Sequence, residues 1–331
     1  MLTARFTPYT LRFNFVARTS RAAMHEKETY FVHIAGPDGE GVGECALFRG
    51  LSADDVPDYE TALAEACRNP EAALQSPYSS IRFGFETALA DYRAGGRRVW
   101  TDTPWARGEE GIEINGLVWM GDKAEMRRRI AQKLDAGFRV LKLKIGGINF
   151  DDELDLLRAV RAEFGPGDVE LRLDANGSFT PANALERLGV LSDFTIHSLE
   201  QPIRAGQPEA MAAICSRSPI PIALDEELIG MRTDSEMAEL LDTIRPQYII
   251  LKPSLCGGFE RSDAWIARAE SRGIGWWATS ALESDIGLNA IAQWVAAKRP
   301  TLPQGLGTGQ LYINNIPNGL ELRGSKLWRK L

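Results

Sequence analysis

The feature that most constrains the fold is a charged or polar residue that recurs every 25 to 30 residues, each time at the end of a strand-like stretch. These stretches cover residues 140–145, 169–174, 195–200, 221–226, 247–252 and 274–280. At the last position of each stretch, or one position before it, stand Lys144, Asp174, Glu200, Asp225, Lys252 and Ser280. One strand followed by one helix takes about this length, so the pattern predicts an α/β fold with parallel strands. With a further strand at 112–118, it favours a (β/α) barrel over the alternative, an open doubly wound sheet.

Alternation within the strands sorts the side chains onto two faces. In LKLKIGG (141–147), Lys142 and Lys144 alternate with three aliphatic residues, and successive side chains of a strand point to opposite faces. For this stretch alone, lysines solvated on a surface strand are the simpler interpretation. In a barrel, however, the carboxyl ends of the strands converge on one mouth, where active sites lie. We therefore expect the lysines to point inward and to meet carboxylates from the other strands.

Three of these carboxylates suggest a metal site. Asp174, Glu200 and Asp225 come from consecutive predicted strands. Oxygen ligands without His or Cys suit a hard cation, which predicts Mg²⁺, with Mn²⁺ as a possible substitute. The alternative is that the three carboxylates form structural salt bridges.

The positive charges around this site indicate an anionic substrate. Lys142, Arg172 and Lys252 would make the mouth receptive to a carboxylate. A nearby dication and a second lysine both lower the pKa of a lysine, which allows it to act as a base. The arrangement predicts the removal of a proton next to a substrate carboxylate, with the resulting charge stabilised by the metal and a lysine.

The first 105 residues differ from this repeating pattern. Three strand-like runs, YTLRFNFVA, ETYFVHIAG and GVGECAL, are followed by helical patterns near 54–75 and 79–95. This order is typical of a small α+β unit. We therefore predict an α+β domain over 1–105 and a barrel domain over 106–305.

Composition limits the environment and the partners of the chain. The formal net charge is −7 over 331 residues, which does not favour binding to nucleic acid or to an anionic membrane. No stretch approaches the roughly 18 apolar residues of a membrane span. The four cysteines are scattered without a CxxC pair, as expected for a reducing cytoplasm and against a cysteine zinc site. We expect a cytoplasmic protein whose partner is a small carboxylate, either a monomer or a homo-oligomer.

Five motifs in order resemble the enolase superfamily, in its muconate-lactonizing-enzyme-like subgroup. They are K-x-K, D-x-N, E-Q-P, D-E and K-P, found here as LKLKIGG, LRLDANGS, LEQPI, ALDEEL and ILKPSLCGG. The resemblance implies a modified (β/α)7β TIM-like barrel with an N-terminal α+β capping domain. It also implies that the C-terminal segment, about 306–331, packs near the capping domain.

Further stretches narrow the resemblance to one branch of the superfamily. SSIRFGFETALAD (79–91), INGLVWMG (114–121) and GLGTGQLYIN (305–314) resemble the hydro-lyases of menaquinone biosynthesis. The implied reaction is the loss of water from 2-succinyl-6-hydroxy-2,4-cyclohexadiene-1-carboxylate to give 2-succinylbenzoate. In it, Lys144 would abstract the α proton and then protonate the departing hydroxyl. Lys252 would stabilise the charged intermediate from the opposite face, and Lys142 would contact the carboxylate oxygens.

The same resemblance implies where the rest of the substrate is bound. The implied substrate-binding residues are Arg172, Asn176, Ser280, Gly307, Thr308 and Gly309. The segment RTSRAAMHEK (18–27) is expected to form a lid. Among the three histidines, His197 is out of phase with Glu200, so we expect it to face outward against helices. Trp276 and Trp277 are interpreted as packing residues.

Other functions stay open. An N-succinylamino acid racemase or a dipeptide epimerase would use the same two opposed lysines, and a muconate-type cycloisomerase is a third possibility. A non-catalytic barrel would be expected to have lost some of the six ionisable site residues, and none is lost. An aldolase that forms a Schiff base needs only the lysine and has no use for three carboxylates.

Overall fold

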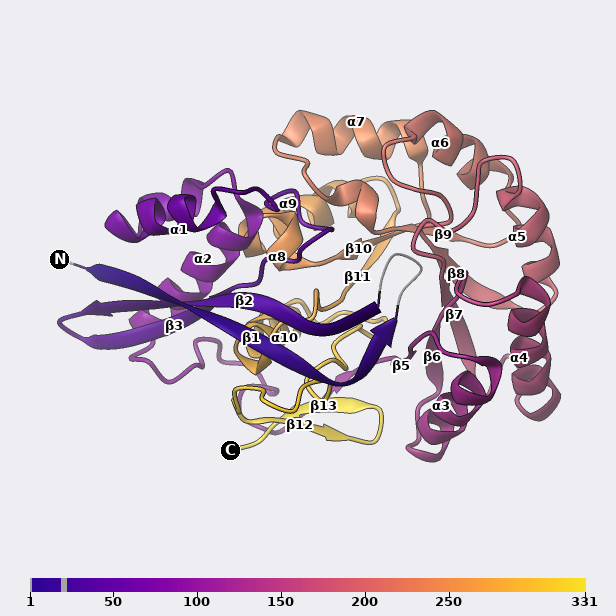
Figure 1. Cartoon of the computed structure of the whole chain (residues 1–331), viewed down its shortest axis with the longest axis horizontal. Coiled ribbons are helices and arrows are strands. Elements are labelled where there is room, and N and C mark those ends of the chain that lie inside the picture. Colours follow the sequence, from indigo (N-terminus) through magenta and orange to yellow (C-terminus); the bar gives the residue numbers. More distant parts are fainter. Residues whose placement is uncertain (1, 19–22) are drawn as a thin grey trace.

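The N-terminal part of the chain is a twisted antiparallel sheet covered by helices (Figure 1). The computed structural model describes residues 2–18 and 23–331, so residues 19–22 of the expected lid lie outside the described residues. The sheet consists of β1 (Thr3–Arg18), β2 (Ala23–Gly36) and β3 (Gly39–Cys45), paired in that order. The helices are α1 (Tyr59–Arg68), η1 (Ala72–Gln75) and α2 (Ser79–Arg93). The three strands and the helical regions predicted for this part are confirmed.

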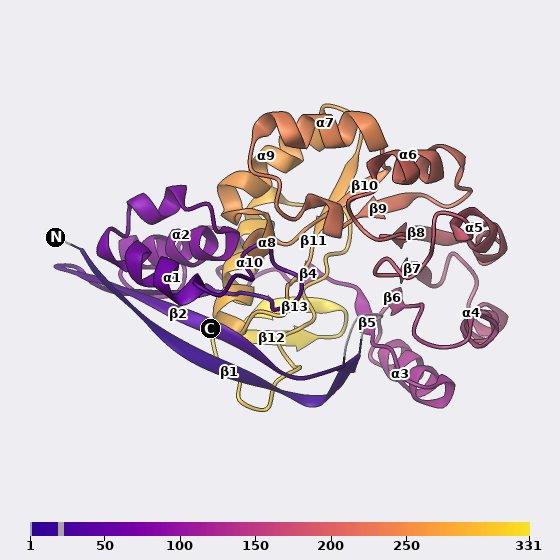
Figure 2. The same cartoon turned by 45° about the horizontal axis from the view of Figure 1, so that its top comes forward.

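Seven parallel strands follow, and they lie in space in the order of the sequence. They are β5 (Gly116–Val118), β6 (Val140–Lys144), β7 (Glu170–Asp174), β8 (Ile196–Glu200), β9 (Ile222–Leu224), β10 (Tyr248–Leu251) and β11 (Gly275–Ala278). The intervening helices are α3 (Lys123–Asp135), α4 (Phe150–Glu163), α5 (Ala184–Ser192), α6 (Pro208–Arg217), η2 (Glu226–Leu228), α7 (Asp234–Ile244), α8 (Pro253–Cys256), α9 (Gly258–Glu270) and α10 (Asp285–Lys298). The sheet curls with the long helices outside it (Figure 2). A doubly wound sheet reverses its strand order, so that alternative is wrong.

A short segment near residue 304 joins the two edges of the curled sheet. Gly305 donates its N–H to Ala278 O, at the end of β11, at 2.7 Å, and Asn115, just before β5, donates its N–H to Gln304 O at 2.9 Å. Isolated parallel bridges pair Thr279 with Gly305 and Ile114 with Gln304. The barrel is therefore closed by an eighth extended segment, as the (β/α)7β architecture requires.

The predicted strand at 112–118 is divided in two. β4 (Ile112–Glu113) pairs antiparallel with β13 (Lys326–Arg329), which pairs with β12 (Leu320–Arg323), while β5 belongs to the barrel. The break falls at Asn115, whose backbone N–H donates to Gln304 O, about 190 residues further along the chain. The C-terminal segment also runs beside β1, since Asn14 donates to Leu311 O at 2.8 Å and Ile313 to Arg12 O at 2.9 Å.

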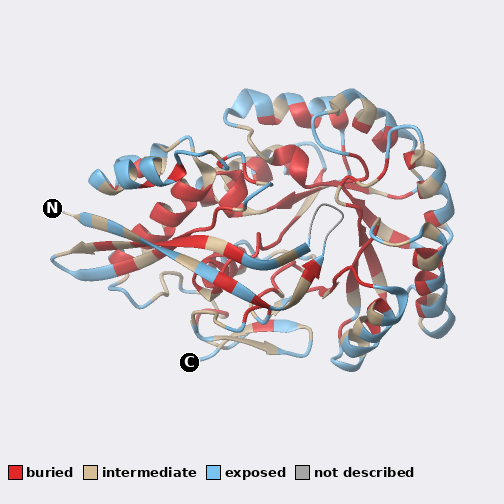
Figure 3. Cartoon of the chain, viewed as in Figure 1, coloured by how far each residue is buried: buried red, intermediate tan, exposed pale blue. Residues whose placement is uncertain are grey.

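The aliphatic residues of the barrel strands pack outward, as predicted. Leu141, Leu143 and Leu171 are buried in one core with Ile130 and Leu157 of the surrounding helices. The buried surfaces of strands and helices face one another, and the exposed faces of the helices point away (Figure 3). Within residues 2–18 and 23–331, no helix is long and apolar enough to cross a membrane.

His197 does not face the helices, so that prediction is wrong. Between β7 and β8 the register shifts: Leu171 pairs with Ile196, whereas Arg172 pairs with Ser198. His197 is the extra residue of this irregularity, and such a bulge redirects side chains. Its ring stacks on Tyr248 at 5.0 Å and lies 6.2 Å from Trp277, centroid to centroid.

Candidate active site

A cavity of about 300 Å³ lies at the carboxyl ends of the barrel strands, beneath the capping sheet. The N-terminal part contributes Met24 and the loop 48–51. Barrel residues that line the cavity include Lys142, Lys144, Asp174, Asn176, Glu226, Lys252, Thr279, Ser280, Gly307 and Thr308. The cavity therefore lies at the end of the barrel where catalytic groups collect in this architecture.

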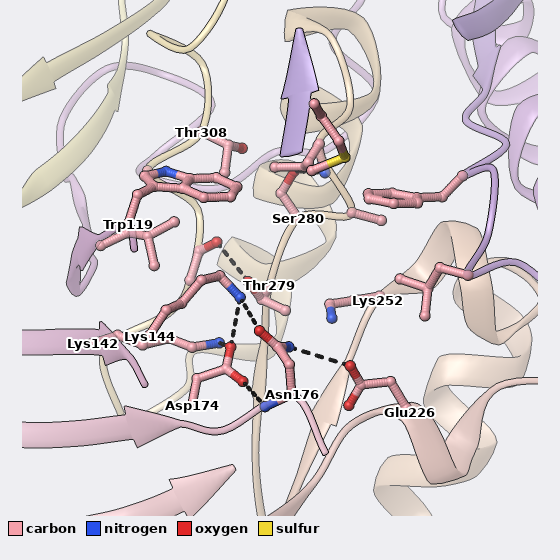
Figure 4. Close-up of a pocket in the computed structure, with 18 of the residues that line it drawn as sticks. Trp119, Lys142, Lys144, Asp174, Asn176, Glu226, Lys252, Thr279, Ser280 and Thr308 are labelled. Atoms are coloured by element: carbon pink, nitrogen blue, oxygen red, sulfur yellow. Dashed lines mark hydrogen bonds and ion pairs between the residues drawn. The ribbon is translucent and has the colours of Figure 1, made fainter. Parts of the chain in front are cut away.

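Two lysines of β6 hold the first two carboxylates. Lys142 Nζ lies 3.1 Å from Asp174 Oδ2 and 2.5 Å from Glu200 Oε2. Lys144 Nζ lies 2.9 Å from the same Asp174 oxygen and 2.8 Å from Asn176 Oδ1 (Figure 4). The alternation of LKLKIGG produces this arrangement, because β6 pairs in register with β7 and places Lys144 beside Asp174.

Lys252 approaches the cavity from the other side. It follows β10, forms an ion pair with Asp225, and lies across the cavity from Lys144 (Figure 4). Glu226, next to Asp225, accepts a hydrogen bond of 3.3 Å from Asn176 Nδ2. Two lysines thus face one space from opposite sides, with carboxylates between them.

Burial and ion pairing have opposite effects on the pKa values of the lysines. Burial lowers the pKa of Lys142, but the carboxylates of Asp174, Glu200 and Asp225 outweigh burial and raise it above its usual value. Burial likewise lowers the pKa of Lys252. Nearby carboxylates, with Asp225 the largest contributor, outweigh burial and raise this pKa above its usual value. These carboxylates therefore favour charged lysines. A cation bound to the carboxylates would act in the opposite direction.

The pKa values of the two carboxylates shift in opposite directions. Burial raises the pKa of Asp174, but Lys142 and Lys144 outweigh burial and hold it well below its usual range. Burial, followed by the charge of Asp174, raises the pKa of Glu200 well above its usual value. Two buried acids so close together are stable only if positive charge lies between them.

The carboxylates fit a hard cation in their chemistry. Glu200 is 2% exposed, and its Oε1 has no hydrogen-bond partner among the described residues. A buried oxygen without a partner is costly and fits a ligand. Within residues 2–18 and 23–331, however, no three His, Cys, Asp or Glu side chains are grouped as a preformed metal site. In the structure, the lysine ammonium groups compensate the carboxylates by forming the ion pairs described above.

Two of the predicted substrate-binding residues do not line this cavity. Arg172 lies two residues before Asp174, deeper in the barrel, where its guanidinium stacks 4.6 Å from the Trp277 ring centroid. It donates to Glu170 Oε1 and Pro303 O, both at 2.8 Å. At Gly309, an added Cβ would meet Asp285 Oδ1 at 2.8 Å, so this residue faces the start of α10. Neither residue is among those that line the cavity, and the contacts of Arg172 and Gly309 with substrate stay predictions.

Several residues that line the cavity were not predicted. Asn115, Leu117 and Trp119 lie on one face of the first barrel strand and its continuation, and all three line the cavity. The period of two in INGLVW could have identified them. Phe48 and Arg49 come from a loop of the N-terminal part, and no local pattern marks them.

The comparisons with known proteins agree with this geometry. The model of the family described as Enolase C-terminal domain-like matches residues 125–320. The o-succinylbenzoate synthase of Desulfotalea psychrophila is 45% identical over 94% of each chain. The chain belongs to the o-succinylbenzoate synthase family of the enolase superfamily.

Solved structures and a second enzyme class complete the comparison. The crystal structure of MenC from Desulfotalea psychrophila matches with a TM-score of 0.85 and 42% identity, covering 99% of both chains. The N-succinyl-L-Arg/Lys racemase of Bacillus cereus is 28% identical over 56% of this chain and 49% of the racemase. The o-succinylbenzoate synthase family is therefore matched over almost the whole chain, and the racemase over about half.

Proposed function

We propose that this chain catalyses the o-succinylbenzoate synthase reaction of menaquinone biosynthesis. The substrate is 2-succinyl-6-hydroxy-2,4-cyclohexadiene-1-carboxylate, which loses water to give 2-succinylbenzoate. The observation that carries the proposal is one cavity in which Lys144 and Lys252 face each other beside Asp174. The 45% identity to the enzyme of Desulfotalea psychrophila supports this substrate over others.

The lysines have separate roles in this reaction. Lys144 takes the proton from the ring carbon that carries the carboxylate, and the electron pair of that C–H bond remains on the substrate. The C–O bond to the ring hydroxyl then breaks, and Lys144 returns the proton so that water leaves. Lys252 holds positive charge on the opposite side, and Lys142, between Asp174 and Glu200, contacts the carboxylate oxygens.

The metal that we propose is Mg²⁺, for which Mn²⁺ can substitute. Enolase-superfamily enzymes generally use a divalent metal, and Asp174, Glu200 and Asp225 are the residues that would hold it here. Bound there, the cation supplies positive charge where the substrate carboxylate becomes more negative.

Removal of divalent metal tests this part of the proposal. Dialysis against a chelator should abolish turnover, and Mg²⁺ or Mn²⁺ should restore it. Dialysis against the same buffer without chelator is the control and should leave turnover unchanged. Full activity of a sample shown by elemental analysis to be metal-free would contradict the metal role.

The proposed reaction is tested by direct turnover. Purified protein is incubated with the cyclohexadiene carboxylate, and 2-succinylbenzoate is measured by chromatography against the spontaneous reaction. We expect product to form in proportion to the protein concentration. Failure to exceed the spontaneous rate with metal present would exclude the proposed function.

A racemase of N-succinylamino acids is the second candidate function. Two lysines on opposite sides of a substrate are what racemisation requires, and the Bacillus cereus racemase matches about half of this chain. The two functions differ in the work required of Lys252: racemisation needs it as a base, and dehydration needs only its charge.

We also propose that the protein acts in the cytoplasm on a small carboxylate, without a nucleic-acid or membrane partner. All four cysteines are free thiols, and Cys45, Cys215 and Cys256 are buried. Free thiols are typical of a reducing compartment. Fractionation of cells with an antibody to the chain would test the location.

A further inference from the structure

Glu283 is a buried carboxylate that the proposed mechanism does not use. It lies between β11 and α10 and is 0% exposed, and it is not among the residues that line the cavity. Its two oxygens accept hydrogen bonds from two different hydroxyls. Ser254 Oγ donates to Oε1 and Ser280 Oγ to Oε2, both at 2.5 Å. Glu283 therefore connects the end of β11 to the segment that follows Lys252.

The hydroxyl of Ser254 lies in α8, two residues after Lys252. The carbonyl oxygen of Lys252 accepts from Leu255 N at 2.8 Å and from Cys256 N at 2.9 Å, so the turn of α8 starts at the lysine itself. This helix has four residues, and so short a helix is not stable by its own hydrogen bonds. The position of α8, and with it the backbone of Lys252, therefore depends on contacts such as the one to Glu283.

The ammonium group of Lys27 brings positive charge to Glu283 from the N-terminal sheet. Lys27, on β2, is 6% exposed, and its Nζ has no hydrogen-bond partner among the described residues. Burial lowers the pKa of Lys27, and Glu44 and then Glu283 lead the groups that act against burial. Burial raises the pKa of Glu283, and the two serine hydroxyls and then Lys27 act against it. Because a buried charge is costly without an opposite charge nearby, the sheet and the barrel stabilise each other here.

We propose that Glu283 is a positioning residue for Lys252: through Ser254 it holds α8 so that the lysine points into the cavity, and Lys27 supplies the opposing charge. The proton transfer stays with Lys144, and the charge that faces the substrate stays with Lys252. The inference rests on the proposed function, because it takes Lys252 to stabilise the charged intermediate. Such stabilisation requires a charge that is held in place before the reaction.

Ser254→Ala tests the connection, because it removes the hydroxyl and leaves both Glu283 and Lys252 in place. A change at Glu283 itself would also release Ser280. We expect kcat for dehydration to fall about tenfold, since a small displacement of a charged group is costly in rate. KM should stay within about twofold, since the lost interaction belongs to the transition state.

The matched control is Ser262→Ala. Ser262 is also 0% exposed, and its hydroxyl donates to Gly258 O at 2.7 Å within α9. This variant loses a buried serine hydroxyl close to α8 in the sequence but leaves Glu283 and Ser254 bonded. It should keep the wild-type kcat.

A double-mutant cycle separates positioning from a general loss of structure. In a Lys252→Ala background, Ser254→Ala should change kcat by less than about twofold, because no lysine is left to position. Lys27→Met should behave in the same way, with a lower kcat in the wild-type background and little effect without Lys252. This second cycle decides if Ser254→Ala does not fold. Equal losses in both backgrounds, or a wild-type kcat in the single variants, would overturn the inference.

A crystal structure of Ser254→Ala decides independently of turnover, including when Lys252→Ala has no rate above the spontaneous one. We expect Lys252 Nζ to be displaced from Asp225, its partner in the wild-type ion pair. An unchanged ion pair and an unchanged α8 would overturn the inference. Failure of the proposed function is seen separately, as absence of dehydration by the wild-type protein.

Discussion

At the scale of single residues, the candidate active-site side chains lie at the carboxyl ends of their strands or directly after them. Lys144, Asp174 and Glu200 were predictable because strand periodicity and strand spacing fix both direction and depth. Arg172 shares their direction but lies one inward position deeper, where it stacks on Trp277. Periodicity predicts which face of a strand a side chain occupies, but contact with substrate also depends on how deep in the barrel the side chain lies. The guanidinium of Arg172 is held deep in the barrel by its hydrogen bonds to Glu170 and Pro303.

Lys144→Ala tests the role of the proposed base. The variant should lose about 10²–10⁴-fold in kcat, the usual contribution of general acid–base catalysis. The variant should still fold, because Lys142 continues to pair with Asp174, but its melting temperature should fall, because Lys144 is a buried ion-pair partner of Asp174. Lys326→Ala is the control, because that lysine lies on β13 and pairs only loosely with Glu113, at 3.7 Å. A Lys144→Ala variant with near-normal kcat would rule out this lysine as the base.

At the scale of elements, the strand and helix units were predictable, but their pairing across the chain was not. The division of 112–118 into β4 and β5 depends on Gln304 and on β13, and no pattern within the segment reveals these partners. The predicted orientation of His197 was wrong for a related reason, because the shift in register between β7 and β8 depends on both strands together. Local periodicity predicts an element, and long-range hydrogen bonds decide its ends and irregularities.

The loop between β6 and α4 carries a pH-dependent contact. Glu153 of α4 accepts a hydrogen bond from Gly146 N at 2.5 Å. Burial raises the pKa of Glu153 to about 7, although backbone N–H groups of the loop and Arg187 act against burial. The folded state therefore binds more protons than the unfolded state between the ordinary value of 4.5 and about 7. The contribution of Glu153 to the free energy of unfolding is fully present below pH 4.5 and is lost as pH rises to 7.

Glu153→Gln checks this linkage, because the amide resembles the protonated acid and does not titrate. From pH 5 to pH 7.5, the melting temperature of the variant should fall less than that of the wild type. Other buried acids titrate equally in both proteins, so the difference between the two curves isolates Glu153. Parallel curves for the two proteins would show that Glu153 does not titrate in this range.

At the scale of the whole molecule, a buried carboxylate joins the N-terminal sheet to the barrel. Glu44 of β3 is 0% exposed. It accepts hydrogen bonds from Ser284 N and Gly287 N, both at 3.0 Å, and from Ser284 Oγ at 2.6 Å, at the start of α10. An acid at a helix N-terminus stabilises that helix. Glu44 and Ser284 are 240 positions apart, and no pattern in the sequence indicates that they pair.

Glu44→Ala should destabilise the fold and the cavity together. The variant leaves buried N–H groups unpaired, and we expect a loss of at least about 1–3 kcal/mol in the free energy of unfolding by urea titration. Because the cavity is lined from both parts of the chain, kcat/KM should also fall. Glu65→Ala on the exposed surface of α1 is the control and should stay within about 0.5 kcal/mol of wild type. Wild-type stability of Glu44→Ala would mean that the two parts are held together by other contacts.

The central claim is that the cavity dehydrates a succinyl-hydroxycyclohexadiene carboxylate rather than racemising an N-succinylamino acid. The most direct test measures kcat/KM for dehydration and for exchange of the α proton of N-succinylamino acids in D₂O, on one preparation with Mg²⁺. We predict that dehydration is faster by far. Exchange that is faster by tenfold, about 1.4 kcal/mol of preference for the other transition state, would contradict the claim and assign the chain to the racemases.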